Sequence, residues 1–210
     1  MSSRSTLIRY GGLAAVAAGT LYFLGAFSTT LDYPSAYLFT GLRLSAVWDV
    51  FMRLLVLVGL AGLHARQVGS LGYGRLGTMG FLLAFVGSLL AAALGPLMFS
   101  GVPGGAPPSL LVIVVTGAVA AAAELGMLLL GVATLRAAVL PLPWGALPLA
   151  LFLLGVPLIT FVGTLFPAGI GVSVLIYAQP LLLGLGWALL GYALWSGVGA
   201  GARHRPARVR

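Results

Sequence analysis

The chain has 210 residues, of which 60% are hydrophobic and 7% charged, with 11 arginines, no lysine, 3 acids and a net charge of +8. A water-soluble domain carries about 25% charged residues, because its surface must face water. The composition therefore excludes a water-soluble globule and favours one membrane-embedded domain. The basic balance does not indicate nucleic-acid binding, because the arginines stand at the ends of apolar runs and not on one basic face.

Six apolar runs follow one another along the chain. A helix rises 1.5 Å per residue, so crossing the ~30 Å apolar core of a bilayer takes about 20 residues. Runs of that length occupy residues 11–31, 44–64, 77–99, 110–135, 146–165 and 172–195. They are continuously apolar and do not alternate, which favours helices over the strands of a membrane barrel. We expect an all-α bundle of about six transmembrane helices over residues 1–200, followed by a basic cytoplasmic tail over 201–210.

The arginines predict the orientation of this bundle. With six crossings, nine arginines lie in the segments that share a side with the two termini, and only Arg43 lies in a loop on the other side. Arginine-rich loops stay in the cytoplasm, so we expect both termini there. The use of arginine without lysine, among many Ala, Gly and Leu residues, is typical of GC-rich bacterial genes. The expected location is therefore the bacterial cytoplasmic (inner) membrane.

The basic tail is also a candidate lipid-binding segment. An arginine close to an anionic membrane surface contributes about 1 kcal/mol of attraction. Its alternative role is a topology signal without a partner. The tail arginines are Arg203, Arg205, Arg208 and Arg210.

Two patterns concern how the helices pack. Similar entry and exit sequences recur at intervals of roughly 60–72 residues, which favours three repeated helical hairpins. Chance similarity among glycine-rich apolar runs is the alternative. Small residues at four-residue steps predict faces where another helix backbone approaches closely. Such stripes are formed by Gly11, Ala15 and Gly19, by Gly80, Ala84, Ser88 and Ala92, and by Ala118, Ala122 and Gly126.

Residue types that are missing argue against most enzymes. Without cysteine there is no disulfide, no iron–sulfur cluster and no thiolate nucleophile. Without lysine there is no phosphate-loop lysine and no Schiff base. Both histidines, His64 and His204, lie near ends of the apolar runs, which disfavours an intramembrane metal or haem site. We therefore expect no cofactor, no metal and no catalytic residue.

Charges inside the spans are the main candidates for a site. Asp49 and Arg53 stand four residues apart on one helix face, and Glu124 lies near the middle of a later span. Gln179 adds a polar group to the last span. A charged group at mid-membrane costs about 2.5–3.5 kcal/mol, so such groups pair and face the bundle interior. We expect Arg53 to contact one of the two carboxylates, either as a structural network or as part of a polar cavity open to the outside.

The segment that leaves the second span carries His64, Arg66 and Gln67, which we interpret as an interfacial anchor, with a proton relay as the alternative. The stretches 63–67, 74–77 and 80–83 together resemble uncharacterised bacterial polytopic membrane proteins with six helices. This resemblance implies no activity and no catalytic residue.

The leading functional interpretation is a non-enzymatic membrane protein, a structural or accessory subunit of a membrane complex. Its partners would be the lipid bilayer and other membrane subunits or a second copy of the chain. A small transporter or channel that uses the buried charges is the alternative, and an intramembrane enzyme is the third. We name Asp49, Arg53 and Glu124 the charged layer. A cavity that reaches the charged layer would favour the transporter.

Overall fold

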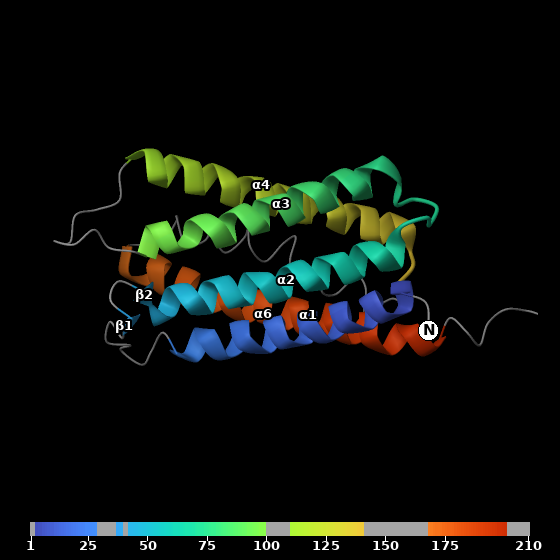
Figure 1. The fold of residues 1–210 in the computed structure, drawn as a ribbon, viewed down its shortest axis with the longest axis horizontal. Coiled ribbons are helices and arrows are strands. Elements are labelled where there is room, and N and C mark those ends of the chain that lie inside the picture. The colour runs from blue at the N-terminus through green and yellow to red at the C-terminus, as the bar shows by residue number, and fades with distance from the viewer. Residues whose placement is uncertain (1–2, 29–36, 40–41, 100–109, 141–167, 201–210) are drawn as a thin grey trace, which may run out of the picture.

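The computed structural model describes residues 3–28, 37–39, 42–99, 110–140 and 168–200, with side chains at 3–24, 47–48, 50–94, 110–140 and 181–197. Five long helices that run along one common direction make up most of this part of the chain (Figure 1). They are α1 (Ser3–Ser28), α2 (Leu44–Gln67), α3 (Gly74–Phe99), α4 (Leu110–Ala137) and α6 (Ala168–Ala200).

Each of the five helices coincides with a predicted apolar run. Helices α1 to α4 contain stretches long and apolar enough to cross a membrane, and α6 contributes a shorter apolar stretch, Leu181–Gly197. The prediction of a helical membrane protein is therefore confirmed. The predicted run 146–165 lies outside the described residues, so neither the count of six spans nor the threefold repeat is confirmed.

Helix α2 connects two pairs of helices. Helices α1 and α6 pack along each other, as do α3 and α4, while α2 packs against both α1 and α3 (Figure 1). The α1–α2, α2–α3 and α3–α4 contacts follow the chain, because consecutive elements usually lie side by side, whereas the α1–α6 pair joins the first and last described helices. Helix α3 separates α2, which carries Arg53, from α4, which carries Glu124.

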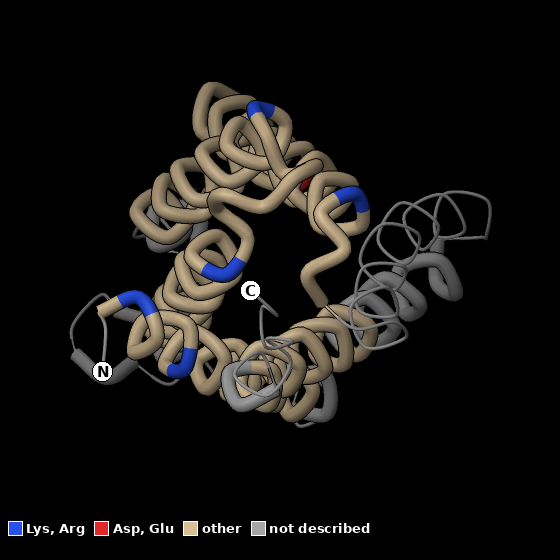
Figure 2. Tube along the Cα trace, turned by 90° about the vertical axis from the view of Figure 1, so that its right-hand side faces the viewer, with Lys and Arg blue, Asp and Glu red and all other residues tan. Residues whose placement is uncertain are grey.

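One end of the bundle gathers the arginines. Helices α1 and α3 begin there, and α2, α4 and α6 end there, so we name it the arginine-bearing end. Figure 2 looks onto this end and shows arginine segments on several helices around it. The described arginines of this end are Arg4, Arg9, Arg66, Arg75 and Arg136. Helix α1 begins about two turns before the predicted span, because its first turns extend past the apolar run to reach the end of α2.

A small departure from the all-helical prediction lies between α1 and α2. Strands β1 (Tyr37–Phe39) and β2 (Leu42–Arg43) pair antiparallel, with Tyr37 opposite Arg43 and Phe39 opposite Leu42. The chain reverses direction here before it enters α2. Helix-forming apolar periodicity does not report such a short local pairing, and the sequence analysis missed it.

Small residues determine how closely the helices approach. Ala84, Ser88 and Ala92 are buried on α3, and a Cβ added to Gly126 of α4 would lie 2.7 Å from the Cα of Ala84. The predicted close contact along the α3 stripe is therefore confirmed. On α4 the stripe is only partly used, because Ala118 is exposed.

Small residues of α1 contact two neighbouring helices. A Cβ on Gly11 would lie 2.5 Å from the Cα of Gly62 in α2. One on Gly12 would lie 2.9 Å from the carbonyl oxygen of Gly191 in α6. Helix α1 thus packs against two neighbours at distances that larger side chains would not allow.

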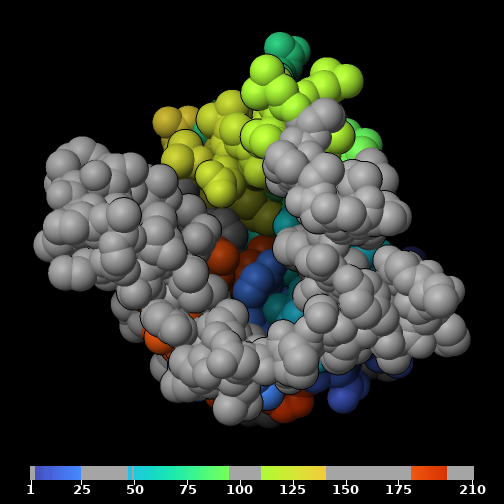
Figure 3. All heavy atoms as spheres, turned by 90° about the vertical axis from the view of Figure 1, so that its left-hand side faces the viewer, coloured from blue at the N-terminus to red at the C-terminus, as the bar shows by residue number. Residues whose placement is uncertain are grey.

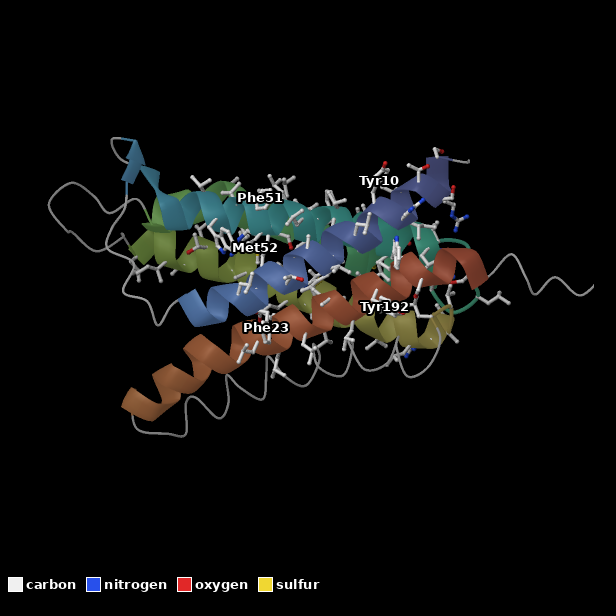
Figure 4. All side chains as sticks on the ribbon, turned by 90° about the horizontal axis from the view of Figure 1, so that it is seen from below. Tyr10, Phe23, Phe51, Met52 and Tyr192 are labelled. Carbon is white, nitrogen blue, oxygen red and sulfur yellow. The ribbon has the colours of Figure 1, made fainter. Side chains whose placement is uncertain are left out.

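Large apolar side chains point outward from the bundle as well as inward. On α2, Phe51 and Met52 lie on different sides of the helix (Figure 4), with exposed fractions of 49% and 3%. Tyr10 and Tyr192 are also exposed. Outward aromatic and aliphatic groups suit a surface that contacts lipid.

Candidate functional site

The predicted charged layer is only partly described. Asp49 lies on α2 and Gln179 on α6, and both side chains lie outside the described set. Arg53 is partly buried and takes part in an interaction. Whether Asp49 is its partner stays a prediction.

The prediction that Arg53 contacts Asp49 or Glu124 stays a prediction, but the described contacts do not include an Arg53–Glu124 pair. The Glu124 side chain is exposed, and no hydrogen bond or ion pair joins it to any described residue. Two residues along a helix correspond to about 200°, so Glu124 lies nearly opposite Gly126, which contacts α3. Arg53 is carried by α2, on the far side of α3 from α4. Matching depth did not bring the two groups together, because their helices are not neighbours.

On the side of α4 that faces away from α3, no other described helix packs, and we name this side the open face of α4. It comprises Gly117, Ala121, Glu124 and Leu128, at steps of three or four residues, and all four are exposed. Around Gly117 there is nothing within 4 Å of an added Cβ. Only 11% of the α4 span is buried, against 50% for α2. Within the described part of the chain, a carboxyl group near the middle of a membrane span therefore stands on a helix surface of small residues that no other helix covers.

A second group of polar residues lies at the arginine-bearing end, around the last turn of α2. His64 Nδ1 lies 2.6 Å from the hydroxyl of Tyr73, and the His64 ring stacks on Phe81 with centroids 4.1 Å apart. Burial raises the pKa of Tyr73 to about 12. The phenol therefore keeps its proton at neutral pH and can donate it to the imidazole nitrogen. This arrangement ties the end of α2 to the start of α3.

Gln67 ties the same turn to α4. Its side chain is fully buried, and its Oε1 accepts a hydrogen bond of 3.1 Å from the hydroxyl of Thr134. The carbonyl oxygen of Leu130, in the same helix as Thr134, lies 2.8 Å from that hydroxyl, so the two acceptors share its single hydrogen. The Nε2 group of Gln67 has no hydrogen-bond partner. A buried amide with an unpaired donor is uncommon, because it loses its water without replacement.

Two arginines complete the contacts of this turn. Arg4 of α1 donates from Nε to the carbonyl of Ala65 and from Nη2 to that of Val68, each at 2.8 Å. These are carbonyls that the end of a helix leaves without internal donors. Arg66 donates from Nη2 to the carbonyl of Gly197 in α6 at 3.0 Å, while its buried Nε has no partner. The end of α2 is thus held by α1, α3, α4 and α6.

The turn between α2 and α3 approaches the end of α4. Gly72 has φ +94°, and a Cβ there would lie 2.5 Å from the carbonyl oxygen of Arg136. Glycine is required on both counts, because other residues strain at this φ and no side chain fits. The predicted interfacial anchor of His64, Arg66 and Gln67 is therefore part of a buried junction. Its contacts with Thr134 and Gly197 span 67 and 131 residues of sequence, so no local pattern reported them.

Figure 3 looks onto the opposite end of the molecule, where parts of α1, α2 and α6 lie deeper than α4. Within the described residues, no group of three or more His, Asp or Glu side chains could hold a metal ion. The predicted lipid-binding arginines Arg203, Arg205, Arg208 and Arg210 lie outside the described residues.

Comparison with known proteins adds no relative. No family model, no curated protein and no solved structure matches the chain.

Proposed function

We propose that this chain is a non-enzymatic structural or accessory subunit of a membrane complex, and that a transmembrane helix of another subunit packs on the open face of α4. The observation that carries the proposal is Glu124, an exposed carboxyl near the middle of a span that has no partner among the described residues. Leaving such a group in lipid costs about 2.5–3.5 kcal/mol. A partner helix that supplies a positive or hydrogen-bonding group would remove this cost.

The shape of the open face supports the same conclusion. Gly117 and Ala121 allow a second backbone to come close, which is how helices associate in lipid. Helix α3 presents the same kind of stripe, and α4 packs against it through Gly126. Among the described helices, the small-residue stripes of α1 and α3 are occupied, whereas the open face of α4 has no described neighbour.

Cross-linking from the open face tests the proposal. Because the chain has no cysteine, Ala121→Cys provides a single attachment point for a benzophenone maleimide in native membranes. We expect an adduct with a second polypeptide after irradiation, and we expect Gly117→Leu to abolish it by filling the face. Val86→Cys, exposed near the middle of α3, is the matched control and should give no such adduct. Equal yields at the two positions, or an adduct that survives Gly117→Leu, would reject the packing role.

A small transporter or channel is the second candidate, and Arg53, a partly buried arginine within the α2 span, supports it. If a water-filled path reaches this position, Arg53→Cys should react with a membrane-impermeant maleimide in intact cells. Protection of Arg53→Cys, with labelling of an exposed loop position as the positive control, would favour the accessory subunit.

We also propose that the protein lies in the bacterial cytoplasmic membrane with its arginine-bearing end in the cytoplasm. The gathering of arginines at one end supports this orientation. Reporter fusions at Gly104 and after Arg210 should report outside and inside, respectively. A periplasmic signal after Arg210 would contradict the orientation.

A further inference from the structure

The turn between α2 and α3 presents one large apolar side chain away from the bundle. Leu71 is 95% exposed, whereas Gln67 and Tyr73, before and after it in the chain, are buried. The amide nitrogen and the hydroxyl of Ser70 both donate to the carbonyl of Gln67, at 3.0 and 2.7 Å. Leu71 is therefore held outward by an ordered turn whose two flanks are fixed in the core.

The lengths of the neighbouring helices place this turn at the level of lipid headgroups. Helix α3, which starts directly after the turn, has 26 residues, and α4, which ends beside it, has 28. At 1.5 Å per residue these helices are about 39 and 42 Å long. A bilayer has an apolar core of about 30 Å and measures about 40–45 Å with its headgroups. Helices of this length that cross the core end within the headgroup layers, and the turn lies there with them.

Arginines surround the exposed leucine. Arg75 stands four residues after Leu71, and the carbonyl oxygen of Arg136 lies 2.5 Å from the position of a Cβ on Gly72. Arg4 donates at 2.8 Å to a carbonyl of the same turn. All three arginines are exposed, and the described residues of this end include no Asp or Glu. Charge complementarity therefore selects a negatively charged partner for the turn.

We propose that the turn between α2 and α3 binds an anionic lipid, with Leu71 inserted below the headgroup and with Arg75 and Arg136 against its phosphate. Each arginine close to an anionic surface gives about a fivefold preference for it. A zwitterionic lipid would accept the leucine but would gain less from the arginines. An acidic cytoplasmic protein would meet the same charges, but it requires a turn that stands clear of the headgroups. This proposal is independent of the open face of α4.

Quenching by spin-labelled lipids tests the proposal on the full-length chain in nanodiscs. Because the chain has no cysteine and Leu71 is exposed, Leu71→Cys carries a single environment-sensitive fluorophore without loss of packing. The probes are phosphatidylglycerol and phosphatidylcholine, each with a doxyl group near the glycerol end of an acyl chain, at the same mole fraction. We expect both lipids to quench the fluorophore, with phosphatidylglycerol enriched at least about fivefold over phosphatidylcholine.

Matched variants separate the site from its surroundings. The same fluorophore on Ser3→Cys, exposed at the start of α1 at the same end, should be quenched less by either lipid and more by aqueous iodide. In the Leu71→Cys background, Arg75→Gln should lower the enrichment of phosphatidylglycerol about fivefold, and Arg136→Gln should do the same. Arg9→Gln removes the same charge from an exposed site on α1 and should leave the enrichment within about twofold.

Three results would overturn the proposal. Quenching at Leu71→Cys by iodide but by neither lipid would place the turn in water and would favour a cytoplasmic protein as its partner. Equal quenching by the two lipids would show insertion without a preference for the anionic headgroup. Equal losses of enrichment in Arg75→Gln and Arg9→Gln would mean a diffuse effect of the charged end.

Discussion

Replacing Gly126 by alanine adds one methyl group at the closest approach of α3 and α4. In the structure the new Cβ would lie 2.7 Å from both the Cα of Ala84 and the carbonyl carbon of Leu83. Ordinary contact begins at 3.4 Å and the backbone nitrogen of Ala84 lies closer still, so the two backbones would have to separate by more than 0.7 Å. The obstructing atoms belong to the backbone, and a side-chain rotation cannot relieve the contact.

Gly117→Ala is the matched control for this change. It adds the same methyl group to the same helix, at a site with nothing within 4 Å. Both variants gain the same helix propensity, about 1 kcal/mol for alanine over glycine. The difference between them therefore isolates the packing cost, which is about 1–3 kcal/mol for an overpacked site.

Thermal melts in detergent, followed by tryptophan fluorescence, measure this difference. The buried Trp187 belongs to the core and is a suitable reporter. For a chain of this size 1 kcal/mol corresponds to about 2–4 °C, so Gly126→Ala should melt about 2–12 °C below Gly117→Ala. Equal melting temperatures would refute the close packing of α3 on α4.

Three further predictions concern the polar groups. Arg4→Gln should lower stability by about 1–2 kcal/mol in a detergent melt, because two carbonyls at the end of α2 lose their donor, whereas Arg9→Gln should change it little. The raised pKa of Tyr73 means that the folded state holds the phenol proton more tightly than the unfolded state does. The stability that this gives is complete below pH 10 and is lost as the pH rises to about 12. Tyr73→Phe should therefore remove this loss of stability in thermal melts measured over a pH series. A double-mutant cycle of Arg53→Ala and Glu124→Ala should be additive within about 0.5 kcal/mol, and a larger coupling would show that the two groups interact.

Much of the helical architecture could be predicted from local sequence. Apolar length determines that a segment such as 77–99 forms a spanning helix, because lipid requires the backbone to bond within its own segment. The four-residue spacing of Ala84 and Ser88 places both small residues on one helix face, and such a face predicts a close helix contact. The gathering of arginines at one end also follows from their places between the runs.

The neighbours of each helix were decided only by the tertiary structure. Periodicity tells which face of α4 carries Glu124, but it does not tell which helix, if any, covers that face. Arg53 and Glu124 have similar predicted depths, yet α3 separates their helices. Gln67 and Thr134 meet, although 67 residues separate them, because α2 and α4 end beside each other. In an apolar sequence rich in alanine, glycine and leucine, many helix pairings satisfy the local pattern equally well. Only the close packing of the helix backbones distinguishes them.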